Sequence, residues 1–156
     1  MKKQLDRIAI KQSLIEKCKA FVQEKIDVAE KLMTEAQDSA NNETKSSMGD
    51  KYETGRAMMH AERDKNARQL SEALKIKMQL DRLQRTELSE KVTFGSVVVT
   101  GYGNYFISIS AGRVVVDGVK YFAISPASPL ALSMQQKQVG DKIEFNDQEI
   151  KIMEVF

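Results

Sequence analysis

A polar stretch from Asp38 to Glu53 separates two long segments of helical periodicity, and this arrangement constrains the fold more than any other feature of the chain. The stretch contains Asn41-Asn42, Ser46-Ser47 and Gly49, which bond their own backbone or tolerate left-handed dihedral angles. A helix that arrives from either side is therefore expected to end within it. Two helices joined by a short turn become antiparallel neighbours, so the sequence predicts a helical hairpin with this stretch at its tip.

Both segments show apolar residues in steps of three and four, the period of a helix that buries one face. The second helix is expected to run from Asp50 or Lys51 to about Arg85, with a polar, weakly packed middle between Met59 and Ala67. The first stripe consists of Ile15, Cys18, Val22, Ile26, Ala29, Met33 and Ala36, widened by Leu14, Phe21 and Leu32. The second consists of Met59, Ala67, Leu70, Ala73, Leu74, Ile76, Leu80 and Leu83.

From Val92 onward the pattern changes to short apolar runs separated by glycines, which predicts a mainly antiparallel sheet. Asp117-Gly118 favours a tight hairpin, and Ser128-Pro129 predicts the start of a short helix, with serine as N-cap and proline at the first helical position. The expected strands are Val92–Phe94, Val97–Val99, Tyr105–Ile109, Val114–Val116, Tyr121–Ile124, Ile143–Phe145 and Ile150–Val155. The sequence thus predicts an α+β protein with a helical hairpin over residues 1–88 and a small β domain with one short helix over residues 89–156.

Composition is that of a soluble globular protein, with 42% hydrophobic and 29% charged residues. A net charge of +2 is too small to indicate bulk binding to nucleic acid. Cys18 is the only cysteine, which excludes an intramolecular disulfide and fits a reducing compartment. The opening residues do not resemble a signal peptide and no run reaches membrane-spanning length, so we expect a cytoplasmic protein without a membrane partner.

Three segments of the β domain carry a resemblance to a known family: Phe94–Val99, Ser128-Pro129-Leu130 and Lys137–Ile143. Together, behind a helical hairpin, they resemble the pattern of the bacterial Gre transcription elongation (transcript cleavage) factors. The resemblance implies that the coiled coil enters the secondary channel of RNA polymerase. It also implies that the second domain is similar in fold to FKBP-type domains and docks on the rim of the channel.

In the Gre family, carboxylates at the tip of the coiled coil help to hold a second Mg²⁺ ion in the polymerase active centre. The ion activates water that cuts the backtracked transcript, so the resemblance implies a factor that stimulates the hydrolytic activity of the polymerase and is not itself an enzyme. A hard cation that keeps several waters suits such a shared site. We expect a monomer that transiently contacts nascent RNA or DNA in the elongation complex, with Lys45, Lys51 and Arg56 as candidate contacts.

Four tip acids are candidates for this role: Asp38, Glu43, Asp50 and Glu53. Asp50 and Glu53 preserve the family's spacing, which places both carboxylates on one side of a helical turn and makes them the candidate metal ligands. The family's following Asn-Ala-Glu-Tyr is missing here, however. An alignment on Gly55-Arg56 instead places Glu43 in the acidic position without an aspartate partner. Both placements remain open, and so does the interpretation that these acids only complement a helix dipole.

Two other functions are compatible with the sequence. A regulator could occupy the secondary channel without stimulating cleavage. The tip acids distinguish such a regulator from a cleavage factor. An FKBP-type prolyl isomerase with a helical arm would need an aromatic-lined pocket, and the chain has no Trp, four Tyr and six Phe. His60 has no second histidine to form a site with, and Cys18 lies on the apolar stripe as a packed thiol.

Overall fold

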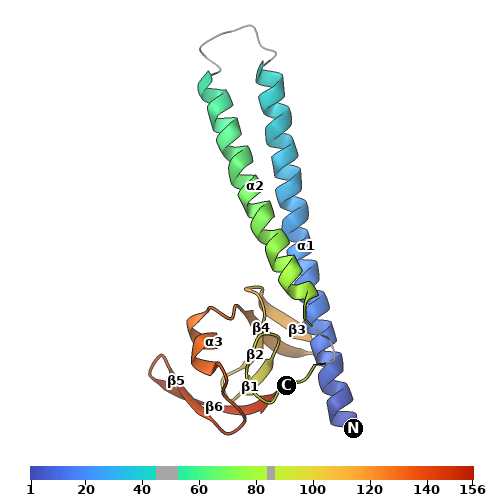
Figure 1. Ribbon diagram of the computed structural model, residues 1–156, viewed down its shortest axis with the longest axis vertical. Helices are drawn as coiled ribbons and strands as arrows, with labels where there is room; N and C mark the ends of the chain where they lie inside the picture. Colours follow the sequence, from blue (N-terminus) through green and yellow to red (C-terminus); the bar gives the residue numbers. More distant parts are fainter. Residues whose placement is uncertain (45–52, 84–86) are drawn as a thin grey trace. The chain divides into compact units, whose positions relative to one another are not determined.

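The computed structural model describes residues 1–44, 53–83 and 87–156, with the backbone alone for residues 40–44 and 53–54. It is an α+β protein, as predicted: two long helices precede a six-stranded mixed sheet that carries a short helix (Figure 1). The helices are α1 (Lys2–Thr44), α2 (Glu53–Asp81) and α3 (Pro129–Met134). The strands are β1 (Val97–Thr100), β2 (Asn104–Ile107), β3 (Gly112–Val116), β4 (Val119–Ile124), β5 (Lys142–Phe145) and β6 (Gln148–Val155). Among the described residues, no helix is both long enough and apolar enough to cross a membrane.

The chain divides into two compact units, one formed by Ala20–Gln79 and the other by Met1–Lys19 together with Leu80–Phe156. Helix α1 therefore contributes residues to both. Within the first unit, which we call the hairpin unit, α1 and α2 run antiparallel and side by side (Figure 1). The predicted boundary after residue 88 stays a prediction.

The apolar stripe predicted for the first helix is buried, from Ile15 to Ala36, with Met33 half-buried. Leu32 is an exception, since 40% of it is exposed. On α2 the predicted stripe is less complete: Ala73 and Leu80 are buried, whereas Leu74 is 43% exposed.

The helix ends differ from the predicted ones. Helix α1 continues through Asn41 and Asn42 to Thr44, beyond the expected start of the turn at Asp38. Adding a residue to an existing helix needs no new nucleus, and an asparagine costs less than about 1 kcal/mol in a helix interior. Helix α2 ends at Asp81 and not near Arg85, with a single further turn closed by the Leu83 amide and the Leu80 carbonyl at 3.1 Å.

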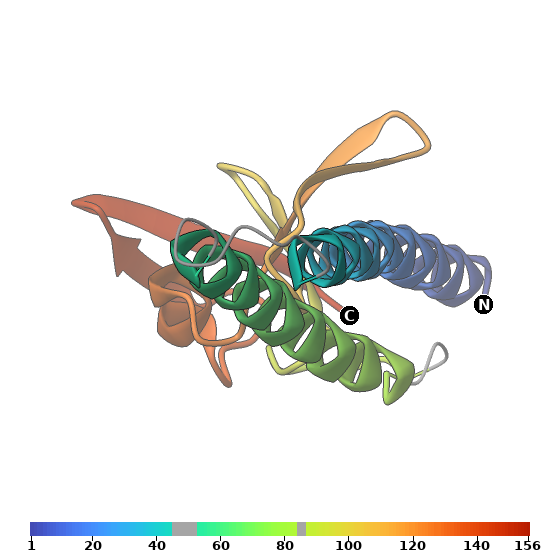
Figure 2. The ribbon, with the colours of Figure 1, turned by 90° about the horizontal axis from the view of Figure 1, so that it is seen from above.

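The sheet has the strand order β3-β4-β2-β1-β6-β5, with hairpins β3–β4 and β5–β6 at its two ends (Figure 2). The sheet is mainly antiparallel, as expected, but β2 and β4 pair in parallel because β3 lies outside β4 at the edge. Asp117 and Gly118, with φ of 50° and 78°, form the predicted β3–β4 turn.

Helix α3 packs on one face of the sheet. Its start is the predicted one: the Ser128 hydroxyl accepts a hydrogen bond from the Ala131 amide at 3.3 Å, and Pro129 opens the first turn. Ala131 and Met134 are buried against the sheet, whereas Leu132 is 56% exposed. The cluster under α3 consists of Val92, Val98, Ile107, Ala131, Met134, Ile143, Ile150, Ile152 and Val155.

The segment Val92–Phe94 is not the strand that its apolar residues predict. Its backbone bonds to the segment after α3 instead, with the Val92 amide donating to Lys137 at 2.8 Å and its carbonyl accepting from Gln136 at 2.8 Å. A turn at Phe94-Gly95, where Gly95 has φ of 90°, then separates it from β1.

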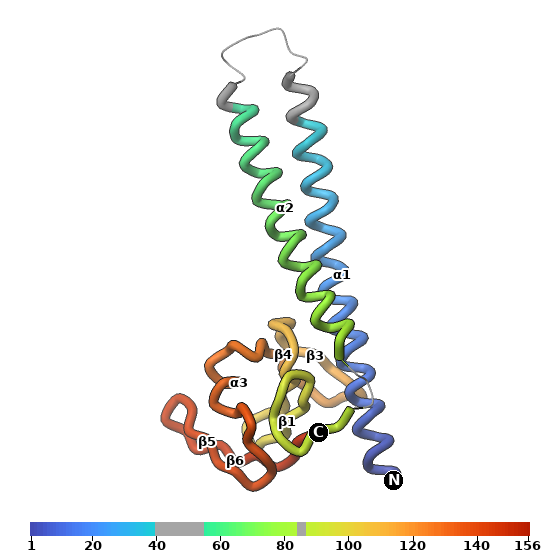
Figure 3. Tube along the Cα trace, in the orientation of Figure 1, coloured from blue at the N-terminus to red at the C-terminus, as the bar shows by residue number. Residues whose placement is uncertain are grey.

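The part of α1 up to Lys19 is tied to the sheet. The Lys17 ammonium donates to the Val115 carbonyl of β3 at 2.7 Å, and the Cys18 sulfur lies 4.0 Å from the Ser108 hydroxyl oxygen. The Arg7 guanidinium lies 5.0 Å from the centre of the Phe156 ring. The C-terminus, which follows β6, lies near the first part of α1 in Figure 3. We infer that this part of α1 covers the sheet face that α3 leaves open, where Phe106 is fully buried.

Candidate functional site

Three of the predicted tip residues lie in described helices, near the end of α1 and at the start of α2, on either side of residues 45–52 in the sequence. Asp38 is exposed on α1, while Glu43 is the last residue but one of α1 and Glu53 is the first described residue of α2. Asp50, Lys45 and Lys51 lie outside the described residues. The two placements of the acidic pair, Asp50 with Glu53 or Glu43 alone, therefore both stay predictions.

A metal site at the tip also stays a prediction. Among the side chains that the structure describes, no three His, Cys, Asp or Glu residues come together in a way that could hold an ion. Two carboxylates alone would leave most of the coordination of Mg²⁺ to water and to other ligands, as the predicted shared site requires.

Arg56, a predicted contact to RNA or polymerase, lies in the first described turn of α2 and is half-buried. Its Nε is buried and has no hydrogen-bond partner in the described part of the chain. A buried donor left without an acceptor costs about 1–3 kcal/mol.

Polar side chains join the two helices of the hairpin unit. The Arg63 guanidinium donates to the Gln37 side-chain oxygen at 3.0 Å, and the Lys77 ammonium donates to that of Gln23 at 3.3 Å. Between these bonds, Asn66 is 2% exposed, and its amide nitrogen has no hydrogen-bond partner among the described residues. A buried, unsatisfied amide costs about 1–3 kcal/mol, so the predicted weak middle of the hairpin has a specific cause.

Asn66 could have been recognised from the sequence, because it lies seven residues before Ala73 and fourteen before Leu80 on the buried stripe. Lys11 continues the stripe of α1 in the same way, four residues before Ile15, and is only 5% exposed. A stripe drawn through apolar residue types alone leaves out both of these buried polar residues.

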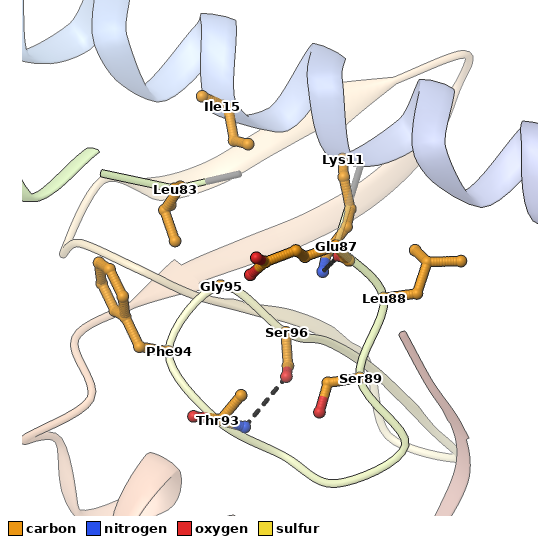
Figure 4. A pocket seen from close by; sticks show the side chains of 10 residues that line it. All are labelled: Lys11, Ile15, Leu83, Glu87, Leu88, Ser89, Thr93, Phe94, Gly95 and Ser96. Atoms are coloured by element: carbon orange, nitrogen blue, oxygen red, sulfur yellow. Dashed lines mark hydrogen bonds between the residues drawn. The ribbon is translucent and has the colours of Figure 1, made fainter. Parts of the chain in front are cut away.

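Lys11 lies at a cavity of about 300 Å³ between α1 and the chain that leads into β1 (Figure 4). Its ammonium donates to the Glu87 carbonyl at 2.7 Å. The other side chains around the cavity are Ile15, Leu83, Leu88, Ser89, Thr93, Phe94 and Ser96.

The serine hydroxyls of this cavity, those of Ser89 and Ser96, already have partners in the chain. The Ser96 hydroxyl accepts from the Thr93 amide at 3.0 Å, the bond drawn in Figure 4, and the Ser89 hydroxyl donates to the Lys91 carbonyl at 2.6 Å. Glycine is required at position 95, next to Ser96, for two reasons. A Cβ atom there would lie 2.7 Å from the Leu83 side chain, and the backbone has a φ of 90°. Lys11 and these turns hold residues 87–96, which precede β1, in place.

Burial lowers the pKa of the Lys11 ammonium from 10.5 to about 8, although the Glu87 carboxylate acts in the opposite direction. The folded state therefore binds fewer protons than the unfolded state between about pH 8 and pH 10.5, and stability contributed by this group rises with pH across that window. The full shift corresponds to about 3 kcal/mol, and water in the open cavity screens part of it.

Replacing Lys11 with methionine is expected to remove this pH dependence. Urea unfolding of the two proteins between pH 7 and pH 10.5 measures the effect. As pH rises, the unfolding free energy of the unmodified protein should increase by about 1–3 kcal/mol relative to that of the variant. Cys18, whose pKa burial raises from 9.0 to about 11, acts with the opposite sign above pH 9 but is common to both proteins. Parallel stability curves would show that the Lys11 ammonium is not held in a desolvated state.

No protein-family model matches the chain, and no curated protein matches it in sequence. Among solved structures, the chain is similar to the transcription factor Gfh1, with a TM-score of 0.36 and 18% sequence identity over 88% of this chain and 92% of that chain.

Proposed function

We propose that the protein is a transcription elongation factor that binds RNA polymerase through its secondary channel and stimulates cleavage of backtracked transcripts. The observation that carries the proposal is the combination of a helical hairpin with a sheet domain whose short helix starts at Ser128-Pro129-Leu130. These residues and Lys137–Ile143 are those that resemble the Gre family.

The positions of the acids in the sequence support the proposal. Asp38 and Glu43 lie near the end of α1, and Glu53 lies at the start of α2, so the segment that joins the two helices is flanked by acids on both sides. Carboxylates carried at the end of a helical hairpin suit an active centre that only a narrow element can enter. There they would complete a Mg²⁺ site together with ligands of the polymerase, and the ion would activate water.

A backtracked elongation complex stalled on a DNA template tests the proposal. With Mg²⁺ present, the unmodified protein is expected to accelerate the release of a short 3′ RNA fragment relative to the complex alone. The same preparation without polymerase should leave the RNA intact, because the hydrolytic activity belongs to the polymerase. Failure both to bind polymerase and to accelerate cleavage would exclude the proposal.

A second candidate is a regulator that occupies the channel without cleavage, favoured by the absence of the Asn-Ala-Glu-Tyr that follows the tip acids in the family. Such a protein would compete with a cleavage-competent Gre factor for polymerase and leave the fragment unreleased. A prolyl isomerase is a weaker candidate, since the cavity at Lys11 has Phe94 as its aromatic side chain where that activity needs several.

A further inference from the structure

One part of the sheet presents aromatic and basic side chains on the same face. In β3 and β4, Arg113 pairs with Phe122 and Val115 with Lys120, so their side chains project to the same side. In the parallel pair, Tyr105 of β2 is the partner of Phe122. We call these five side chains the β3–β4 face: Tyr105, Arg113, Val115, Lys120 and Phe122.

The β3–β4 face is on the side of the sheet that α3 covers, but beyond the reach of α3. Val98 is paired with Tyr105, which places both on the same side, and Val98 belongs to the cluster under Ala131 and Met134. Tyr105 borders that cluster, whereas Phe122 and Val115 are each 40% exposed. The apolar surface therefore continues from the core of the domain to an open area at the edge.

The aromatic rings on this face are in contact and stand next to cations. The ring centres of Tyr105 and Phe122 lie 6.1 Å apart at an angle of 36°. Arg113 is directly opposite Phe122, and side chains in such pairs start about 5 Å apart. The arrangement offers a ring surface with a positive charge at its side.

These cations are free of carboxylate partners. Within the described ranges, neither Arg113 nor Lys120 forms an ion pair, and Asp117 in the β3–β4 turn is the only acid of the hairpin. The other hairpin differs, because Lys142 of β5 pairs with Glu149 of β6 at 3.0 Å. Lys17 also fixes the position of β3 by its bond to the Val115 carbonyl, so the face is held in place before a ligand arrives.

The size of the face decides between two kinds of anionic partner, an acidic protein surface and a single-stranded nucleic acid. A stable protein interface takes about 20 residues on each side and a buried anchor at its centre, and five side chains on a flat face supply neither. Stacking of one base on an aromatic ring contributes about 1–3 kcal/mol, and each neighbouring cation can neutralise one phosphate. Two rings and two cations match a segment of two or three nucleotides.

We propose that the β3–β4 face binds single-stranded RNA, with bases on Phe122 and Tyr105 and phosphates at Arg113 and Lys120. The Tyr105 hydroxyl has no hydrogen-bond partner among the described residues and is available to a ribose 2′-hydroxyl, the group that separates RNA from DNA. This site belongs to the sheet domain and is independent of the tip and of polymerase.

Fluorescence anisotropy with a labelled ten-residue oligouridine RNA and the full chain, in low salt and without polymerase, tests the proposal. Phe122→Thr is expected to weaken binding at least about fivefold, since it removes a stacking surface and keeps a residue suited to a strand. Arg113→Gln and Lys120→Gln should each reduce the slope of log affinity against log salt by about 0.7. An oligothymidine DNA of the same length should bind several-fold more weakly.

Met153→Thr and Lys151→Gln are matched controls on β6, where Met153 is 55% exposed and Lys151 is exposed as well. Both should bind the RNA as the unmodified protein does. Undetectable binding, or equal losses in controls and face variants, overturns the proposal. Equal affinity for DNA and RNA also overturns it. Displacement of the RNA by poly-glutamate that depends on Phe122 overturns it as well, and would indicate an acidic peptide as the partner.

Discussion

Replacing Asp50 with asparagine and Glu53 with glutamine is expected to return transcript cleavage in a backtracked complex to the rate without the factor. The substitutions keep the shape of the side chains and remove their charge, so a Mg²⁺ ion held by carboxylates should be lost. Glutamine is about as good a helix former as glutamate, so helix formation at Glu53, the first residue of α2, should change little. Cleavage assays with the single and double variants measure the effect.

Glu43→Gln distinguishes the two placements of the acids. If the double variant remains active and Glu43→Gln does not, the acid lies on the α1 side of the tip, and the alignment on Gly55-Arg56 is the correct one. Competition with a cleavage-competent Gre factor for polymerase provides the control. A variant that still competes but does not stimulate cleavage has kept binding and lost the cleavage function. An unmodified protein that competes but never cleaves would support the non-cleaving regulator.

Replacing Phe106 with alanine is expected to lower the free energy of unfolding by about 3–5 kcal/mol. Phe106 is fully buried in β2, between its partners Val97 of β1 and Ala123 of β4. Because a small domain has only about 5–15 kcal/mol of stability in total, the loss amounts to a large part of it. Urea unfolding followed by tyrosine fluorescence suits a chain with four Tyr and no Trp.

Phe122→Ala is the matched control on the adjacent strand. It removes the same atoms from a ring that is 40% exposed, so we expect a loss below about 1 kcal/mol. Similar losses at both positions would show that the ring of Phe106 is not the one that fills the core.

The helices could be predicted because their signal is local. Steps of three and four residues identified the buried side of α1, and Lys11 and Asn66 occupy positions on those same stripes. What the sequence could not show is whether a polar residue on a stripe is turned outward or buried. That depends on the segments that cover it, such as the chain at Glu87 that accepts a hydrogen bond from Lys11.

The strands and turns were also predictable, while the order of the strands was not. Asp117-Gly118 indicates that β3 and β4 are neighbours, but no local feature indicates that β4 then returns beside β2 in parallel. Similarly, Val92 carries the residue type of a strand and makes its backbone bonds with Gln136 and Lys137, more than forty positions away. The tip stays a prediction because its chemistry depends on residues 45–52, outside the described part of the chain.

The pairing of the earliest and latest parts of the chain in one unit has a consequence during synthesis. Leu14, Ile15 and Cys18 leave the ribosome early, yet they belong to a unit whose strand β1 bonds to Phe156 through both backbone groups, at 2.7 and 3.0 Å. Contacts of such sequence separation form slowly, and apolar surface that waits for its partner is prone to aggregate. We therefore expect the apolar residues of this segment to stay without their partners in the unit while residues 80–156 are being made, and to be prone to aggregate during that time.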